Sequence, residues 1–479
     1  MSPIASPAQT TEGTPPAPAP TTRTRRRSLG RSGFVLALAC GAMSMVGLDV
    51  AIVNVALPSI QRDLGVSQSS LQWVVVAYGL LLGGFLLVGG RMTDLLGRRR
   101  ILLAGLGLFT AASLLAGMAQ HTGVLIAARG LQGFGGALIA PAALSLLAVT
   151  FREGRERNRA LGIFGAVGGV AGTFGVVAGG LIAAGPGWRW AFFINVPAGV
   201  VMIGLATACL AADRPSNRST RLDVAGASAI TSGLLLFVYA LHHAGTHGWA
   251  STSTLAWFVA AAAVMAAFVT IEARSSASLV PARWLKNRTL VAANSTAFLA
   301  FSAFFSFIFL GSLLMQQELD YSPTQTGLAW LATTATEFVT ACAAGRIAAA
   351  VGVRRLLMVG LSLLTVGMLW LTQVPADAGY LVDLLPAFLL AGLGFGLCGP
   401  SLQIGALSGV TESESGLASG LVETMREIGA AAGVAAVSTV LVAGTGLDGF
   451  HAAFAAIGAL AALGAVTAAV GFRRQAALR

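Results

Sequence analysis

Charged residues are scarce in this sequence. Asp, Glu, Lys and Arg together make up 10% of the 479 residues, whereas hydrophobic residues make up 56%, and the mean hydropathy is +0.79. A water-soluble chain of this length could not bury so much apolar surface. The lipid bilayer is therefore the expected solvent.

Lysine and cysteine are nearly absent. Lys286 is the single lysine and is not preceded by glycine, so the chain has no phosphate-binding loop ending in Gly-Lys-Ser/Thr. The cysteines stand alone in apolar runs, which predicts neither a disulfide framework nor a metal cluster. Gly-x-Ser-x-Gly and His-Glu-x-x-His motifs are also missing. A membrane enzyme or sensor is disfavoured, and no metal or cofactor is expected. The isolated cysteines are Cys40, Cys209, Cys342 and Cys398.

Long apolar runs dominate the rest of the chain. Runs of about 20 residues are long enough to cross a bilayer as helices, and their number predicts an all-α integral membrane protein with fourteen spans. These cover residues 34–57, 72–90, 101–120, 124–149, 159–184, 189–211, 224–243, 252–272, 290–315, 325–347, 355–373, 380–409, 416–442 and 450–471.

The basic residues indicate the orientation of these spans. With the N-terminus inside, 26 of the 30 Lys and Arg residues fall in cytoplasmic segments, which predicts that both termini are cytoplasmic. Topology thus explains the net charge of +11, and nucleic-acid binding is not needed as a hypothesis. Residues 1–32 are expected to form a disordered basic tail near anionic lipid head groups, and 473–479 a short cytoplasmic tail.

A short polar stretch between two apolar runs, Gly89 to Arg100, occurs twice. Gly90, Arg91, Gly97, Arg99 and Arg100 each find the same residue 255 positions later, from Gly345 to Arg355. An isolated copy would be interpreted as a topology-setting loop. A second repeat supports duplication instead: Gly133, Gly135, Leu138 and Pro141 match Gly392, Gly394, Leu397 and Pro400 at an offset of 259.

Duplication predicts two six-helix halves, residues 33–211 and 290–472, with two inserted helices and their flanking loops in 212–289. Paired bundles of this kind are typical of secondary transporters, whose substrate site lies between the halves near mid-membrane.

Ionisable residues inside the predicted spans are functional candidates, because charge at such depth is costly. Asp49 and Arg129 both fall about 22 Å from the cytoplasmic edge, so a pair is predicted; a structural Asp49 beside a snorkelling Arg129 is the alternative. Glu337 lies near the middle of 325–347. Glu423, Arg426 and Glu427 lie in 416–442, the first two spaced i,i+3, and a neutralised structural cluster is the alternative there.

Buried carboxylates of this kind can exchange a proton for a cationic or polar substrate, which would couple proton entry to substrate exit. Other polar and aromatic residues are candidates for lining the cavity, although packing is the alternative for each of them. They are Asn54, Gln72, Trp73, Tyr78, Gln132, Asn294, Phe298, Phe301 and Phe305.

Together these features resemble the major facilitator superfamily, specifically its fourteen-span drug/proton antiporters of the EmrB/QacA type, over residues 34–472. A first-helix motif is similar to Leu48-Asp49 through Pro58. The cytoplasmic motif is matched by Gly90, Asp94, Gly97, Arg98 and Arg99, with Leu95 where a basic residue is usual. The fourth-helix motif is matched by Arg129, Gln132, Gly133, Gly135 and Ala137.

The resemblance implies alternating access by rocking of the halves, with Asp49 and Arg129 in proton and substrate coupling, and with the cytoplasmic motif in conformational gating. The partners implied are a small-molecule drug or natural product, protons and membrane lipids, with a monomeric protein in a bacterial plasma membrane. Export or import of a specific metabolite is the alternative.

One departure from the family concerns the fifth span. The usual Gly-Pro before Gly-Gly is replaced by a stretch from Gly175 to Gly179 and Gly180 without proline. The missing proline removes a kink, which bears on the direction of antiport. The glycines remain, and they predict close approach of the spans 159–184 and 325–347.

Overall fold

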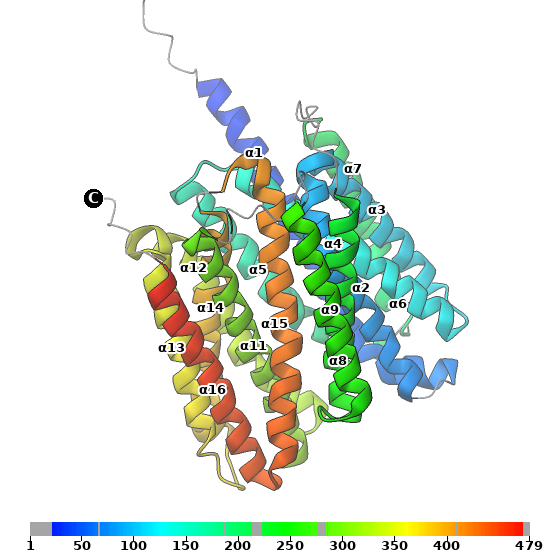
Figure 1. The fold of residues 1–479 in the computed structure, drawn as a ribbon, viewed down its shortest axis with the longest axis vertical. Helices are drawn as coiled ribbons and strands as arrows, with labels where there is room; N and C mark the ends of the chain where they lie inside the picture. Colours follow the sequence, from blue (N-terminus) through cyan, green and yellow to red (C-terminus); the bar gives the residue numbers. More distant parts are fainter. Residues whose placement is uncertain are drawn as a thin grey trace, which may run out of the picture.

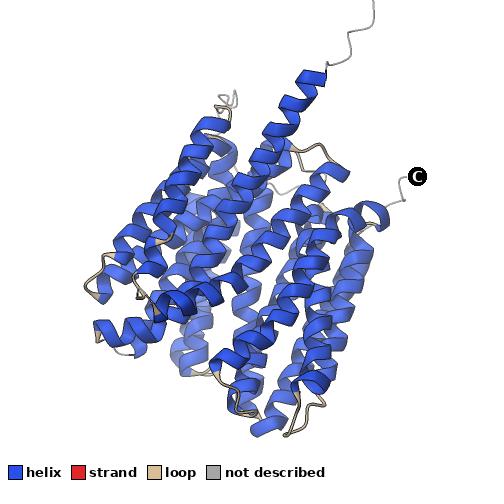
Figure 2. Ribbon diagram, turned by 180° about the vertical axis from the view of Figure 1, so that it is seen from behind, coloured by secondary structure: helices blue, strands red, loops and turns tan. Residues whose placement is uncertain are grey.

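The protein is described here by a computed structural model that covers residues 22–65, 68–185, 187–212, 223–274, 284, 286–408 and 410–472. These residues form a helical bundle, and no strand occurs among them (Figure 2). The first half holds α1 (Thr22–Leu64), α2 (Gln68–Leu96), α3 (Arg98–Gly117), α4 (Thr122–Thr150), α5 (Arg155–Ala184), α6 (Trp190–Phe193) and α7 (Asn195–Cys209).

The remaining helices follow in the same order as the predicted spans. They are α8 (Val224–His247), α9 (Thr252–Arg274), α11 (Arg288–Gln317), α12 (Pro323–Val351), α13 (Val353–Leu371), the π-helical turn η1 (Tyr380–Leu384), α14 (Leu385–Leu407), the 3-10 turn η2 (Glu412–Glu414), α15 (Ser415–Ala443) and α16 (Gly446–Gly471).

Within the described residues, eleven helical stretches are long and apolar enough to cross a membrane. They include α6 with α7, and η1 with α14, each as one stretch. Helices α5, α8 and α12 coincide with predicted spans but are not among the eleven. Threonines and Glu337 lower the apolar character of α12, and parts of α5 and α8 lie outside the described side chains. Fourteen membrane crossings remain a prediction.

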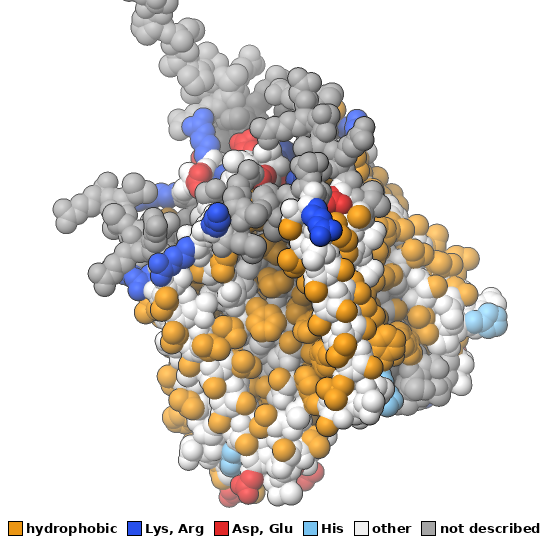
Figure 3. All heavy atoms as spheres, viewed as in Figure 1, with side chains coloured by type: hydrophobic (Ala, Val, Ile, Leu, Met, Phe, Trp, Pro, Cys, Tyr) orange, Lys and Arg blue, Asp and Glu red, His pale blue; other side chains and the backbone are white. Residues whose placement is uncertain are grey.

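Charge is distributed unevenly along the bundle. On the face seen in Figure 3, Lys and Arg side chains gather toward the end from which α1 projects, beyond a broad belt of hydrophobic side chains. The first turns of α1 and the last turns of α16 lie at that same end (Figure 1). We call this the basic end.

Helix α1 begins earlier than expected. It starts at Thr22, so residues 22–32 of the predicted tail belong to this helix. Residues 1–21 lie outside the described part, and the disorder of the tail stays a prediction. Residues 21–32 contain no proline, and their arginines and leucine favour helix. These residues extend the helix that the apolar span establishes.

Helix contacts recur between the two ends of the chain. Helices α2 and α3 both pack on α4, and α1 packs on α5; likewise α12 and α13 pack on α14, and α11 packs on α15. Between the groups, α2 packs on α15, and α12 packs on α5. The inserted α8 and α9 pack on each other, and α8 also contacts α2 and α15.

The closest backbone approaches follow the offsets of the sequence repeat. A Cβ on Gly133 of α4 would strike the carbonyl oxygen of Tyr78 of α2, and one on Gly392 of α14 would strike that of Thr333 of α12. Thr333 stands 255 positions after Tyr78, and Gly392 stands 259 after Gly133. The duplication predicted from the sequence is thus repeated in how the helices cross.

The contacts between the groups are equivalent as well. A Cβ on Gly90 of α2 would strike the Gly416 carbonyl oxygen of α15, and one on Gly345 of α12 would strike that of Asn158 of α5. Gly345 is the repeat partner of Gly90. The two groups of helices therefore meet at two similar crossings, one on each side.

Gly133 offers a test of this packing. Changing Gly133 to Ala is expected to destabilise the protein by about 1–3 kcal/mol, because the methyl group overlaps backbone that cannot rotate away. Gly107 lies in α3 with nothing within 4 Å of its Cβ position, so Gly107→Ala is the matched control and should be neutral or slightly stabilising. Thermal unfolding in detergent measures both; equal midpoints would contradict the assignment of a close crossing.

Candidate functional site

Asp49 of α1 and Arg129 of α4 form an ion pair in the interior, as their predicted depths indicate. An Arg129 guanidinium nitrogen lies 2.5 Å from Asp49 Oδ2, and the residues are 0% and 1% exposed. Charges so buried are stable only when paired and hydrogen-bonded. The lone snorkelling arginine considered above does not describe this arrangement.

Two amides complete the coordination of the carboxylate. Gln132 Nε2 donates to Asp49 Oδ1 at 2.9 Å, and Asn195 Nδ2 of α7 donates to the same oxygen at 2.8 Å. Gln132 also donates to Ser113 Oγ of α3 at 2.8 Å. We name Asp49, Arg129, Gln132 and Asn195 the Asp49 network. Asn195 and Ser113 were missed by the sequence reasoning, although Asn195 is a polar residue within an apolar run.

The remaining guanidinium contacts tie Arg129 to α2. Its Nε donates to the Val74 carbonyl at 3.0 Å, and its charge lies over the Tyr78 ring, 4.2 Å from the centroid. The Tyr78 hydroxyl is buried without a hydrogen-bond partner in the described residues, and it lies within electrostatic range of Glu427 of α15. Tyr78 thus contacts Arg129, and its helix α2 also packs on α15.

A second charged cluster lies on α15. Arg426 and Glu423 form the predicted i,i+3 ion pair, and the guanidinium lies 4.4 Å from the centre of the Phe301 ring. Arg426 is within electrostatic range of Glu337 of α12 and of Glu427. Glu423 is buried, Glu337 is partly exposed and Glu427 is exposed. We name Glu337, Glu423, Arg426 and Glu427 the α15 cluster; it holds carboxylates beyond the one that neutralises Arg426.

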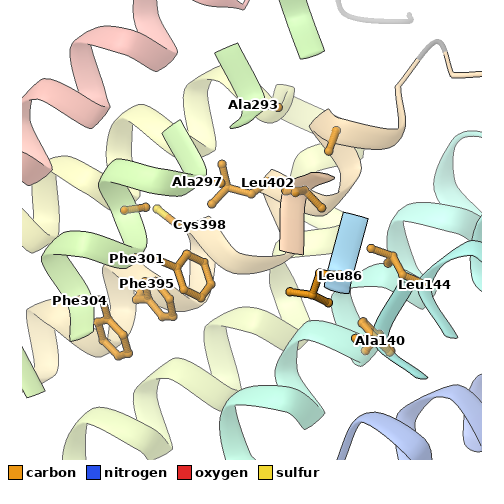
Figure 4. Close-up of a cluster of buried hydrophobic side chains, with 14 of the residues drawn as sticks. Leu86, Ala140, Leu144, Ala293, Ala297, Phe301, Phe304, Phe395, Cys398 and Leu402 are labelled. Atoms are coloured by element: carbon orange, nitrogen blue, oxygen red, sulfur yellow. The ribbon is translucent and has the colours of Figure 1, made fainter. Parts of the chain in front are cut away.

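An aromatic group adjoins the α15 cluster. Phe304 of α11 stacks on Phe395 of α14 with centroids 3.6 Å apart, and Phe301 meets Phe395 edge-on at 5.0 Å. Figure 4 shows Phe301, Phe304 and Phe395 side by side between the two helices. Phe305 is 41% exposed and stacks on Phe301. Flat apolar faces are thus placed next to charge, a combination suited to amphipathic molecules.

The other residues predicted to line the cavity are more scattered. Trp73 is exposed and stacks on Tyr239 of α8 at 6.1 Å. Asn294 is buried and its Nδ2 donates to the Leu290 carbonyl of its own helix at 2.8 Å. Phe298 is half-buried where Gly429 of α15 crosses α11. The side chains of Asn54 and Gln72 lie outside the described part of the chain.

The repeated polar loop joins α2 to the start of α15. Asp94 Oδ1 and Oδ2 accept hydrogen bonds from the backbone N–H groups of Gly416 and Leu417, both at 2.8 Å. Helix N-termini carry partial positive charge and unpaired N–H groups, so a carboxylate there is stabilising. The helix that Asp94 caps begins 321 residues further along the chain.

Arginines of the loop reinforce this junction. Arg98 donates to the Glu412 carbonyl of η2 and to Ser145 Oγ of α4 at 3.0 Å, and Arg99 donates to the Thr207 carbonyl of α7 at 2.9 Å. Gly97, at φ 104°, provides the left-handed turn between α2 and α3. We name the contacts of Asp94 and Arg98 with η2 and α15 the α2–α15 clasp. Ala349 stands where the repeat would place a second Asp94.

The glycines of the fifth span do not have the predicted neighbour. Cβ atoms on Gly175 and Gly179 would strike Ala51 and Ile52, both on α1, so the prediction that they bring α5 close to α12 is wrong. That approach is made by Gly162, which lies against Gly345. The reason is helical phase: Gly175 and Gly179 lie on the face of α5 toward α1. Gly180 lies outside the description of side chains.

Comparisons with known proteins agree with this architecture. A sequence model described as the Major Facilitator Superfamily matches residues 39–300 and 292–478. The puromycin resistance protein pur8 of Streptomyces alboniger is 38% identical over 411 residues, covering 85% of this chain and 81% of that protein. The cephamycin export protein CmcT of Amycolatopsis lactamdurans is 37% identical over 429 residues, covering 89% and 88%.

Among solved structures, the human organic anion transporter MFSD10 (TETRAN) is similar in fold. Its TM-score is 0.65 at 16% sequence identity, with 95% of this chain and 100% of that chain covered. The family match begins at residue 39 and continues to residue 478. It agrees with the two relatives, which are more than 30% identical to this chain over most of their lengths. The chain belongs to the Major Facilitator Superfamily and is a multi-pass membrane transporter.

Proposed function

We propose that the chain exports drugs or antibiotics from the cell in exchange for protons, by alternating access. The observation that carries the proposal is the presence of two charge clusters within the helical bundle, the Asp49 network in the first half and the α15 cluster in the second. Two relatives of the chain are named for puromycin resistance and cephamycin export. Both clusters contain carboxylates that a proton or a cationic substrate would neutralise.

The proton step would act on the ion pairs. Protonation of Asp49 removes the charge that holds Arg129. Among the described residues, Arg129 then keeps its contacts with the amide oxygen of Gln132, the Val74 carbonyl and the rings of Tyr78 and Phe192. In the α15 cluster, Glu427 is exposed and Glu337 is partly exposed, so these two are the carboxylates that an incoming cation meets. The neighbouring phenylalanines would bind its apolar part.

Alternating access would use the two equivalent crossings. The α2–α15 crossing at Gly90 and the α5–α12 crossing at Gly345 are related by the repeat, so the two halves can rock about them. Among the described residues, the α2–α15 clasp is found at the first crossing, and Ala349 stands in place of the aspartate at the second. The clasp would favour the state in which the basic end is closed, and its release would open that end.

The membrane placement follows from the charges. We place the basic end in the cytoplasm, with fourteen spans and both termini inside a bacterial plasma membrane, because basic residues concentrate on the cytoplasmic side. The proton gradient is the proposed energy source, with no bound cofactor, and the proposed unit is a monomer.

Transport assays test the proposal. Expression in a pump-deficient host should lower accumulation of a fluorescent cation, and a protonophore should abolish the effect. Asp49→Asn and Glu427→Gln should reduce efflux to the level of the empty vector. Asp377→Asn makes the same carboxyl-to-amide change in an exposed loop and should leave efflux intact.

Other results would favour the alternative. A drug-susceptibility panel without any change, together with export or uptake of an endogenous metabolite, would identify a metabolite transporter. Protonophore-resistant efflux, or full activity of Asp49→Asn and Glu427→Gln, would contradict proton coupling at these residues.

A further inference from the structure

A pocket of about 550 Å³ lies between the beginning of α11 and the end of α16, and none of its described lining residues belongs to either charge cluster. Two basic side chains, Lys286 and Arg288, are part of its lining, and so are the apolar side chains of Val291, Val466 and Val470. No acidic residue is among its described lining residues. Charge and apolar surface are thus separated along one groove.

The valines face outward from the bundle. Val291 is 42% exposed, Val466 58% and Val470 63%. In a membrane transporter, exposed valines on outer helices contact lipid tails, because burial in hydrocarbon is favourable for them. The apolar part of the pocket is therefore open to the bilayer.

Lys286 and Arg288 line the pocket just before the predicted span 290–315, so we expect them at the level of the lipid head groups. Arg288 donates to the Val470 carbonyl at 2.6 Å, which holds its guanidinium across the last turn of α16. Asn287 caps α11 by accepting from the backbone N–H groups of Thr289 and Leu290, so Lys286 is positioned directly before a well-formed helix start. Lys286 is exposed and has no hydrogen-bond or ion-pair partner among the described residues.

We propose that this pocket binds one anionic phospholipid, with its phosphate between Lys286 and Arg288 and an acyl chain along Val291, Val466 and Val470. Two cations beside an apolar groove, without an acidic residue in the described lining, match the charge and shape of such a lipid and not those of a zwitterionic one. The site goes beyond the proposed transport function and depends only on the membrane location of the chain. A lipid here would join α11 to α16.

Native mass spectrometry of the delipidated full-length protein tests the site. Titration with phosphatidylglycerol should give one high-affinity lipid adduct, and phosphatidylcholine should not. Lys286→Gln should weaken the adduct about fivefold, and the double variant with Arg288→Gln about twenty-five-fold, as expected for a loss per basic residue of the size found at membrane surfaces. Arg274→Gln, an exposed arginine at the end of α9, is the matched control and should bind like the wild type.

Ser295→Trp provides a variant that keeps both charges. Ser295 is exposed and lines the pocket, so the indole should occupy the space of the acyl chain and weaken binding while thermal unfolding stays unchanged. Equal binding of the two lipids, wild-type affinity in the double variant, or displacement by an equal concentration of glycerol 3-phosphate would overturn the proposal. The first two results would exclude charge recognition, and the third would indicate a site for phosphate alone.

Discussion

Arg129→Gln is expected to destabilise the protein by about 3–5 kcal/mol, because it leaves the Asp49 carboxylate buried without its counter-charge. Gln132 and Asn195 still donate to Asp49, but neutral amides do not replace the charge in a low-dielectric interior. Thermal unfolding midpoints in detergent measure the loss. Transport should fail as well, since the same pair is the proposed site of proton exchange.

The double variant Asp49→Asn/Arg129→Gln separates the two effects. Removing both charges relieves the unpaired carboxylate, so much of the stability should return, whereas transport should not. A double variant as unstable as Arg129→Gln alone would contradict the role of the ion pair in stability. One that transports with proton dependence would contradict its role in coupling.

The ion pair of Asp63 with Arg189 is the matched control. It joins α1 to the turn before α6 at 2.6 Å, with side chains 47% and 38% exposed. Hydrogen bonds from Arg189 and Trp188 hold the pKa of Asp63 below its usual value, yet water screens the pair. We expect Arg189→Gln to change the unfolding midpoint little. A loss as large as that of Arg129→Gln would show that burial is not the deciding difference.

Local sequence patterns predicted the parts of the site that depend on depth. Asp49 and Arg129 were matched because helical rise converts sequence position into height, and their ion pair is present. Glu423 and Arg426 were matched because three residues place them on one helix face. The same reasoning could not find Asn195 or Ser113, since depth does not say which helices are neighbours.

Partners brought together by tertiary packing were beyond the sequence. Asp94 was identified as part of the cytoplasmic motif, but nothing in the loop 410–415 shows that its carboxylate caps α15. The glycines of α5 showed that some helix approaches closely without showing which one. Small residues allow contact on any face, and only the rotation of the helix decides whether Gly175 meets α1 or α12.

Breaking the α2–α15 clasp is the second large effect we expect, and it concerns conformation. Asp94→Asn replaces one acceptor oxygen by a donor that faces a backbone N–H, and it removes the charge at the start of α15. The loss should shift the equilibrium between closed and open basic ends by about 1–3 kcal/mol, that is, about 5–150-fold in population. Spin labels at Leu96→Cys and Ser413→Cys, both exposed, in a chain without its four native cysteines would report a longer distance.

Asp223→Asn is the control that removes the same chemistry without joining two halves. Asp223 caps α8 by accepting from Gly226 N at 2.8 Å within its own segment. Asparagine can still cap the helix, so the change removes only the charge at one helix end, at a cost of about 0.3–1 kcal/mol. The Leu96–Ser413 distance should then stay as in the unmodified clasp. A carboxylate that only caps α15 would stabilise the closed and the open state equally. If Asp94→Asn leaves this distance unchanged, or if Asp223→Asn lengthens it equally, the clasp does not control opening.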